Sequence, residues 1–360
     1  MRNIVVLLGR RDQPTDGVED YCERLAEALG EHGYRLQQVR VAWADEGWGA
    51  AYRRLWSEAV RWRGGWALVQ YTALSWSRRG FPTGFLLVLA ILKRRGCRVG
   101  VVFHDPEGFP GSRWIDWARR APQHRIMRAA YALAEQTVHN VPVERVGWLP
   151  RPAPKAVYIP VGANVPAVLE REARAGAQDG RRTVAVFCVT GGSSGEEEVR
   201  DIARALGRAR RAVGTLRLVA MGRGSREAEG ALQRALDGVG VELSVMGVLP
   251  AGEVSRELAE ADALLFVRGP LSSQRTSAIG GLACGLPVVG YSGMHTGPPL
   301  TEAGLLLAPY RDSGALADGL TRVLSDRDLW QHLHERSVEA YRRHFSWEAI
   351  ATRYIEVLGG

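Results

Sequence analysis

Short apolar runs alternate with amphipathic, polar-flanked segments along the whole chain. Residues 3–8 form the first run, and the segment after it repeats apolar residues at helical spacing up to Gly33. In the second half, the apolar run 183–189 precedes a polar helix that begins at Glu196. The pattern predicts further strands at 35–41, 67–71, 98–103, 216–221, 241–245, 263–267 and 288–289, and helices at 51–61, 85–92, 251–259 and 315–324. Strands alternating with helices predict parallel sheets of an α/β protein.

One strand–loop–helix–strand unit in the second half carries the densest candidate chemistry. The run 263–267 leads into a hydroxyl-rich turn, a stretch of small residues, and then Gly285-Leu286-Pro287 before the next apolar pair. The turn contains Ser272, Ser273, Thr276 and Ser277. A loop at the carboxyl end of a parallel strand that opens a helix collects N–H groups and partial positive charge, which suit a phosphate. An ordinary polar loop is the alternative reading of these residues.

A glycine-rich turn stands between the strand at 183–189 and the helix that follows it. Its residues Gly191, Gly192 and Ser193 could surround a phosphate with backbone N–H groups. The turn contains no cation, and three glutamates come directly after it. We therefore expect the positive charge for a phosphate to come from Arg268 and Arg275, since a guanidinium binds phosphate through two parallel hydrogen bonds.

The composition is that of a soluble globular protein, with 46% hydrophobic and 24% charged residues in 360. Four widely spaced cysteines, without metal-ligand spacing, indicate reduced thiols in a cytosolic protein. The apolar start is short and lacks a cleavage site, so it predicts a β-strand rather than a signal peptide. The uncharged, apolar stretch of residues 80–92 is too short to span a bilayer.

The net charge of +8 lies in the first half of the chain. Residues 1–170 contain 24 Lys and Arg against 16 Asp and Glu, whereas the remainder contains 23 of each. This asymmetry favours an acidic partner such as a phospholipid surface, a phosphorylated lipid or an anionic glycan, while an arginine-rich genome is the alternative explanation. No nucleic-acid motif is present, and the arginines are scattered, so we expect no nucleic-acid partner.

Tryptophan and arginine interleave in the segment 108–128. The residues that mark it are Arg113, Trp114, Trp117, Arg119 and Arg120. Such interleaving suits a membrane interface or an anionic acceptor. An irregular loop and helix whose tryptophans pack on the domain is the equal alternative.

The run Leu282-Ala283-Cys284-Gly285-Leu286-Pro287-Val288-Val289 resembles the donor-site block of family 4 glycosyltransferases, E-G-F-G-L-x-x-x-E-A-M-A-C-G-x-P-V-V. Further segments resemble that family in the same order, through to the closing Phe345-Ser346-Trp347-Glu348. The resemblance implies the GT-B fold: two Rossmann-like, doubly wound α/β domains facing each other across a cleft. It places an N-terminal acceptor-side domain at 1–170, a nucleotide-sugar domain at 183–344, and a C-terminal helix at 345–360 that crosses back to the first domain.

The resemblance also implies an activity and a set of site residues. A retaining, metal-independent hexosyltransferase would take a nucleotide diphosphate sugar as donor substrate and use no further cofactor. His104, at the end of a strand, would face the donor sugar, and Gly17 and Gly162 would lie near the donor. Two family features are missing: Ser272 and Gly280 stand where the family has two glutamates, and the turn 190–195 lacks the usual Arg and Lys. We assign catalysis to His104 and Arg275.

These departures leave two other classes open. A GT-B protein that has lost catalysis and serves as a sugar-nucleotide-binding partner subunit would explain the missing glutamates. An epimerase or phosphorylase-like enzyme is the other class, although the only lysines are Lys93 and Lys155, both outside the second domain. The expected location is the cytoplasm, with peripheral contact at the inner face of the membrane as a further option.

Overall fold

The computed structural model describes residues 2–11, 16–105, 107–108, 114–169 and 180–359. The chain divides into two compact units. The first comprises Met1–Val161 together with Trp347–Gly360, and the second comprises Gly162–Ser346. Residues 162–169 therefore belong to the second unit, whereas the sequence placed them in the first. The C-terminal segment groups with the first unit from Trp347 onward.

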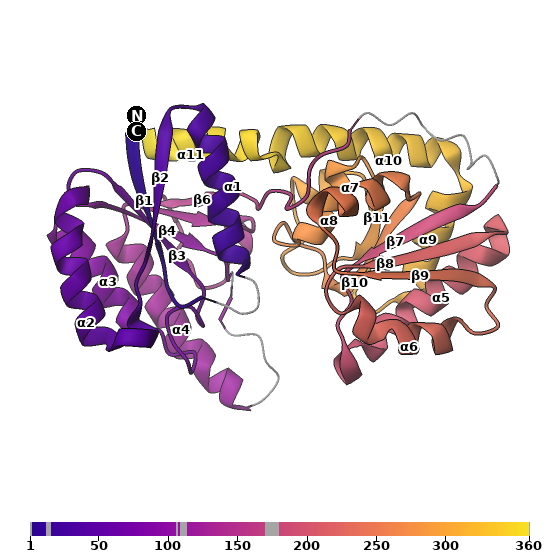
Figure 1. Cartoon of the computed structure of the whole chain (residues 1–360), viewed down its shortest axis with the longest axis horizontal. Helices are drawn as coiled ribbons and strands as arrows, with labels where there is room; N and C mark the ends of the chain where they lie inside the picture. Colours follow the sequence, from indigo (N-terminus) through magenta and orange to yellow (C-terminus); the bar gives the residue numbers. More distant parts are fainter. Residues whose placement is uncertain (1, 12–15, 106, 109–113, 170–179, 360) are drawn as a thin grey trace. The chain divides into compact units, whose positions relative to one another are not determined.

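The first unit is built on a six-stranded parallel sheet with helices on both faces (Figure 1). The strand order is β2-β1-β3-β4-β5-β6. The strands are β1 (Arg2–Leu8), β2 (Tyr34–Arg40), β3 (Trp66–Tyr71), β4 (Arg98–Phe103), β5 (Gln136–His139) and β6 (Ala156–Tyr158). The helices are α1 (Gly17–Glu31), α2 (Trp43–Glu58), α3 (Thr83–Arg94), α4 (Trp114–Leu133) and α11 (Trp347–Gly359).

Buried contacts with α1 and β3 attach the C-terminal helix α11 to this unit. The buried stripe of α1 includes Tyr21 and Leu25, and Asp16 caps its first turn by accepting hydrogen bonds from backbone N–H groups. The Tyr21 hydroxyl lies 2.8 Å from the hydroxyl of Tyr354 on α11. The indole of Trp66 on β3 donates to the carbonyl of Leu358 at 2.7 Å. These buried hydrogen bonds attach α11 to the sheet and helix of the first unit.

The second unit is a six-stranded parallel sheet of order β12-β11-β10-β7-β8-β9, again with helices on both faces (Figure 1). Its strands are β7 (Arg182–Phe187), β8 (Leu216–Met221), β9 (Val241–Gly247), β10 (Ala263–Pro270), β11 (Val288–Tyr291) and β12 (Leu305–Ala308). Its helices are α5 (Glu196–Val213), α6 (Ser225–Leu236), α7 (Ala251–Glu260), α8 (Thr276–Ala283), α9 (Ser313–Ser325) and α10 (Arg327–Ala340). This is the strand order of dinucleotide-binding Rossmann domains.

The two sheets confirm the predicted α/β class with parallel strands. The two sheets differ at one edge. In the first unit β2 is the edge strand, next to β1, whereas in the second unit two strands, β8 and β9, lie beyond β7. Among the differences from the sequence prediction, α2 begins at Trp43, before the expected start at 51, and neither β5 nor α6 was predicted. In the described part of the chain, no helix is both long and apolar enough to cross a membrane.

Candidate functional site

The strand order of the second unit brings two of the predicted loops to one place. β7 and β10 are hydrogen-bonded neighbours, with Val184 opposite Ala263, yet the chain leaves them toward opposite edges of the sheet. The carboxyl ends of strands at such a reversal form the crevice where open α/β sheets bind ligands. The glycine-rich turn after β7 and the hydroxyl-rich turn after β10 both begin at this crevice.

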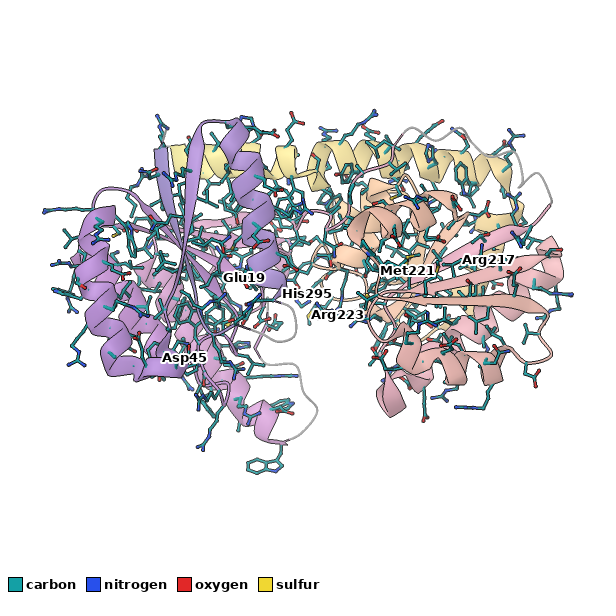
Figure 2. All side chains as sticks on the ribbon, viewed as in Figure 1. Glu19, Asp45, Arg217, Met221, Arg223 and His295 are labelled. Carbon is teal, nitrogen blue, oxygen red and sulfur yellow. The ribbon has the colours of Figure 1, made fainter. Side chains whose placement is uncertain are left out.

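Backbone crowding explains the glycines of these turns. A Cβ at Gly195 would lie 1.7 Å from the carbonyl oxygen of Thr190, and one at Gly224 would lie 1.7 Å from that of Val189. The Val189 N–H donates to the carbonyl of Arg223, so the turns after β7 and β8 are joined. Figure 2 shows Arg223 just beyond the carboxyl end of β8. Only glycine allows the chain to pack this closely at the crevice.

Glu198 fixes the turn after β7. Its carboxylate accepts hydrogen bonds from the backbone N–H of Thr190 at 2.8 Å and from the Thr190 hydroxyl at 2.6 Å. The sequence treats this residue only as one of three glutamates that suit a helix N-terminus. Gly191 and Gly192 lie on the turn so held, Gly192 with a φ of +69°. Ser193 belongs to the short 3₁₀ turn Gly192–Gly195.

Two arginines, Arg268 and Arg275, lie near the carboxyl end of β10. Arg275 is an exposed residue, yet partial loss of solvation and the positive charge of Arg268 lower the pKa of its guanidinium, and the negative charge of Glu198 opposes the shift. Arg275 Nη2 lies 3.8 Å from where a Cβ would stand on Gly269. Arg268 is half-buried, and its Nε has no hydrogen-bond partner among the described residues. Neither arginine forms an ion pair in the described part of the chain. An anion at this point would relieve the repulsion between two neighbouring cations.

The hydroxyl-rich turn is more enclosed than the sequence suggested. Ser272, Ser273 and Ser277 are all less than a tenth exposed, and Thr276 is half-buried. Arg275 occupies the N-cap position of α8, and no side chain caps that helix end. Gln274, Arg275 and Thr276 are therefore the accessible polar side chains of this turn.

Gly280, where the resembling family has its second glutamate, lies in the buried middle of α8. A Cβ there would lie 3.2 Å from Cγ2 of Val165, which is tighter than most real contacts. Ser272 is in the turn before the helix and is 8% exposed. A larger acidic side chain at Gly280 would require Val165 to move.

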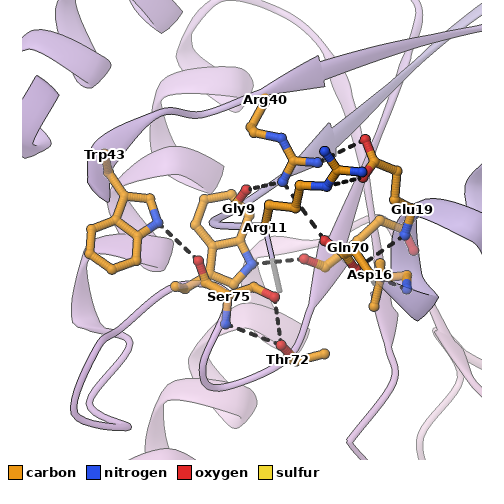
Figure 3. Close-up of polar contacts among 11 residues, drawn as sticks. Gly9, Arg11, Asp16, Glu19, Arg40, Trp43, Gln70, Thr72 and Ser75 are labelled. Carbon is orange, nitrogen blue, oxygen red and sulfur yellow. Dashed lines mark hydrogen bonds and ion pairs between the residues drawn. The ribbon is translucent and has the colours of Figure 1, made fainter. Parts of the chain in front are cut away.

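The first unit has its own strand reversal, between β1 and β3, and a polar network surrounds it (Figure 3). Arg40 pairs with Glu19 at 3.1 Å and donates to the carbonyl of Gly9 at 2.8 Å. Asp16 caps α1, and Arg40 lies 3.9 Å from its carboxylate. Gly17 has open space where a Cβ would stand, so close packing inside this chain does not explain that glycine.

His104 follows β4 and is held by the end of β3. Its Nε2 lies 2.8 Å from Oε1 of Gln70, a residue that is only 1% exposed. The His104 ring meets the ring of Tyr21 edge-on, with centroids 5.1 Å apart. Burial lowers the pKa of His104 to about 4, and the negative charge of Asp16 acts in the opposite direction. The imidazole is therefore neutral at physiological pH.

The pKa of Asp105, the residue that follows His104, is also shifted. Burial raises the pKa of Asp105 to about 6, although the N–H of Ala73 donates to its carboxylate at 3.0 Å. The Tyr71 hydroxyl is buried and has no hydrogen-bond partner among the described residues. The sequence singled out His104 but missed Gln70 and Asp105. A polar residue inside the otherwise apolar run of β3 was the available signal for Gln70.

The remaining predicted residues lie elsewhere. Gly162 is buried and opens the second unit. Trp114 and Trp117 are 81% and 72% exposed on α4, which contradicts the alternative that they pack on the domain. Arg119 and Arg120 are half-buried, and Arg113 lies outside the described residues. No group of three or more potential metal ligands occurs in the described ranges.

Comparison with solved structures identifies the fold. Anabaena HepE in complex with UDP and glucose is 12% identical, with a TM-score of 0.66 and full coverage of both chains. Sucrose-phosphate synthase from Thermosynechococcus elongatus is 17% identical, with a TM-score of 0.67 over 99% of this chain and 98% of that one. An α,α-trehalose-phosphate synthase (UDP-forming) from Burkholderia xenovorans, with glucose-6-phosphate, is 12% identical, with a TM-score of 0.61 and full coverage of both chains. The fold is GT-B.

A sequence-family model gives the second finding. Residues 184–326 match the family described as "Glycosyl transferases group 1". The match begins within β7 and ends directly after α9, so it includes both turns at the β7/β10 crevice. No curated protein sequence matches the chain. The fold and this domain together support a glycosyltransferase.

Proposed function

We propose that the protein transfers a hexose from a nucleotide diphosphate sugar to an acceptor. The observation that carries this proposal is the pair Arg268 and Arg275 at the β7/β10 crevice of a domain that matches group 1 glycosyl transferases. HepE of Anabaena, which shares the fold, has been solved with UDP and with UDP-glucose. A diphosphate is the anion that two adjacent guanidinium groups would hold at such a point.

In this reaction the bond from the sugar to the diphosphate breaks, and the diphosphate leaves with negative charge. Arg268 and Arg275 would stabilise that charge as it develops, which is the main electrostatic task of the second unit. Because the two arginines supply positive charge themselves, we propose a metal-independent transfer. Retention at the sugar carbon belongs to the same proposal and follows from the resemblance to family 4 enzymes.

The first unit would supply His104 as a neutral hydrogen-bonding group for the reacting sugar. Neutrality suits this role, since an imidazolium next to a developing cationic sugar would be unfavourable. The positive charge of residues 1–170 leads us to propose an anionic or lipid-linked acceptor. The expected setting is the cytoplasm.

A partner subunit that binds the sugar nucleotide without catalysis is the second candidate. Ser272 and Gly280 favour it, because both occupy positions where the resembling family has glutamates. Activity separates the two candidates, whereas nucleotide binding is common to both.

Thermal unfolding with a panel of nucleotides and sugar nucleotides tests the proposal, with and without EDTA. A ligand at about 100 times its dissociation constant adds about 2.7 kcal/mol of apparent stability. We expect UDP, GDP or dTDP sugars to raise the unfolding temperature equally with and without chelator. The absence of a shift with every nucleotide would contradict donor binding. Detection of transferred sugar then distinguishes an enzyme from a binding subunit.

A further inference from the structure

The helix α4 has an outward face that is aromatic at its start and basic further along. Trp114 and Trp117 are one helical turn apart and are the most exposed large apolar side chains of the first unit, at 81% and 72%. Arg125 and Arg128 are exposed on the same helix. The opposite face is buried, through residues that include Gln123, Ile126 and Met127. The tryptophans therefore make no contribution to the core of their own unit.

A second segment, the turn before α3, lies against this helix. Gln123 Nε2 donates to the carbonyl of Gly80 at 2.6 Å, and Cδ of Arg119 lies 3.6 Å from where a Cβ would stand on Gly80. The same turn exposes Phe81, at 42%, together with Arg78 and Arg79. We call Arg79, Phe81, Trp114, Trp117 and Arg125 the aromatic–basic patch. Its two segments are 33 residues apart in the sequence, between Phe81 and Trp114.

The charged side chains that the two segments expose are positive, and Glu107, a carboxylate from another segment, pairs with His124 of α4 at 3.3 Å. Asp116, the only acidic residue of α4, is buried and pairs with Arg119 at 3.1 Å. The exposed turn of residues 77–81 contains no acidic residue. Neither Arg79 nor Arg125 forms an ion pair within the described ranges. The patch thus presents indoles and cations with no exposed carboxylate on either segment.

We propose that the aromatic–basic patch docks on the surface of an anionic lipid bilayer. Indole rings partition into the interfacial region of a bilayer, where an apolar body and a polar N–H are both accommodated, and arginines attract anionic headgroups. An anionic bilayer carries negative charge over its whole surface, which complements two segments that expose only positive charge. Insertion of the indoles and attraction of the arginines to anionic headgroups are each weak, but together they give stable attachment to the bilayer.

This inference is independent of sugar transfer, since it rests only on exposed side chains of the first unit. It can therefore fail while the proposed activity holds, or hold while that activity fails. The test is flotation of the full-length protein with vesicles of phosphatidylcholine alone and of phosphatidylcholine mixed with phosphatidylglycerol. We expect flotation with the anionic vesicles, little with the neutral ones, and release at high salt.

Three variants sharpen the test. The double variant Trp114→Ala and Trp117→Ala should lower the bound fraction on anionic vesicles by roughly 10-fold or more, because both indoles leave the interface. Arg79→Glu with Arg125→Glu should lower it similarly and weaken its dependence on salt. Trp56→Ala is the matched control, since Trp56 is an exposed tryptophan of the same unit, 43% exposed and stacked with Arg95, but on α2. The control should float as the wild type does.

Circular dichroism of each variant confirms that the protein is folded. Equal flotation of the wild type and the double tryptophan variant would overturn the proposal. So would equal binding to neutral and anionic vesicles, or the absence of flotation with both. Retention on immobilised heparin without flotation would also overturn it, and would favour a soluble acidic acceptor.

Discussion

The imidazole Nε2 of His104 lies 2.8 Å from the side-chain oxygen of Gln70, and both residues are at the carboxyl ends of neighbouring parallel strands. An amide oxygen accepts hydrogen bonds, so this contact favours the tautomer in which Nε2 carries the proton. Gln70 is thus a positioning residue for His104.

Gln70→Glu should raise the pKa of His104 from about 4 by about 1–3, because a carboxylate within hydrogen-bond distance favours the imidazolium. NMR titration of the histidine ring nitrogens measures this directly. Gln136→Glu, at the amino end of β5, is the control and should leave His104 unchanged. An unchanged His104 titration in Gln70→Glu would show that the contact does not govern the ring.

The stability of the protein should fall as the pH drops below about 6.5. Burial holds His104 and His139 neutral in the folded state, with pKa values of about 4 and about 3, whereas the unfolded chain binds these protons from about 6.5 downward. Asp105 acts oppositely, since its raised pKa of about 6 makes the folded state bind a proton first.

Urea titrations between pH 7 and pH 4 measure this dependence. His139→Phe should flatten the loss of stability with falling pH, and Asp105→Asn should steepen it. The same slope in both variants as in the wild type would contradict the assignment of these groups.

The glycines at the β7/β10 crevice should be intolerant of a methyl group. Gly224→Ala places a Cβ 1.7 Å from the carbonyl oxygen of Val189 at a φ of +77°, so we expect a loss of about 3 kcal/mol or more. Gly252→Ala, in open space on α7, should instead stabilise by about 0.5–1 kcal/mol. Thermal unfolding measures both, and similar melting of the two variants would rule out the predicted clash.

Glu198 has two roles that substitution can separate. Glu198→Ala removes the partner of Thr190 and should cost about 1–3 kcal/mol of stability as well as weaken nucleotide binding. Glu198→Gln keeps a hydrogen-bond acceptor for Thr190 but removes the negative charge that partly offsets the positive charge of Arg275. It should tighten diphosphate binding by roughly 1 kcal/mol, about fivefold. Titration calorimetry with UDP measures the affinities of the wild type and of both variants. Weaker UDP binding by Glu198→Gln than by the wild type would contradict this prediction.

Sequence patterns predicted the fold well where apolar runs are long. The strands β4 and β8 have the predicted bounds, because each is a mostly apolar run that is followed directly by a polar residue or a glycine. The four residues of β5 are too few and too polar to show a pattern. Gly47, with a φ of +79° inside α2, interrupts the helical pattern and hides the true start of that helix.

The candidate sites were predictable only as separate residues. Ser272, Ser273 and Ser277 look accessible in the sequence because they are polar, yet the packing of α8 and its turn buries them. The contact of Gln70 with His104 depends on the parallel register of β3 and β4, which no local pattern specifies. The reach of Glu198 back to Thr190 is likewise a property of the folded turn.

The central claim is that Arg268 and Arg275 hold the diphosphate of a nucleotide sugar. Isothermal titration with UDP, GDP and dTDP sugars, followed by a transfer assay with the sugar nucleotide that binds, tests it most directly. A charge-assisted phosphate contact is worth about 1.5–3 kcal/mol, so Arg275→Ala should lower transfer by roughly 10–150-fold. Arg275→Lys should recover only part of this, because an ammonium lacks the planar fork. If Arg275→Ala changes neither binding nor transfer, the diphosphate is held elsewhere and the account is contradicted.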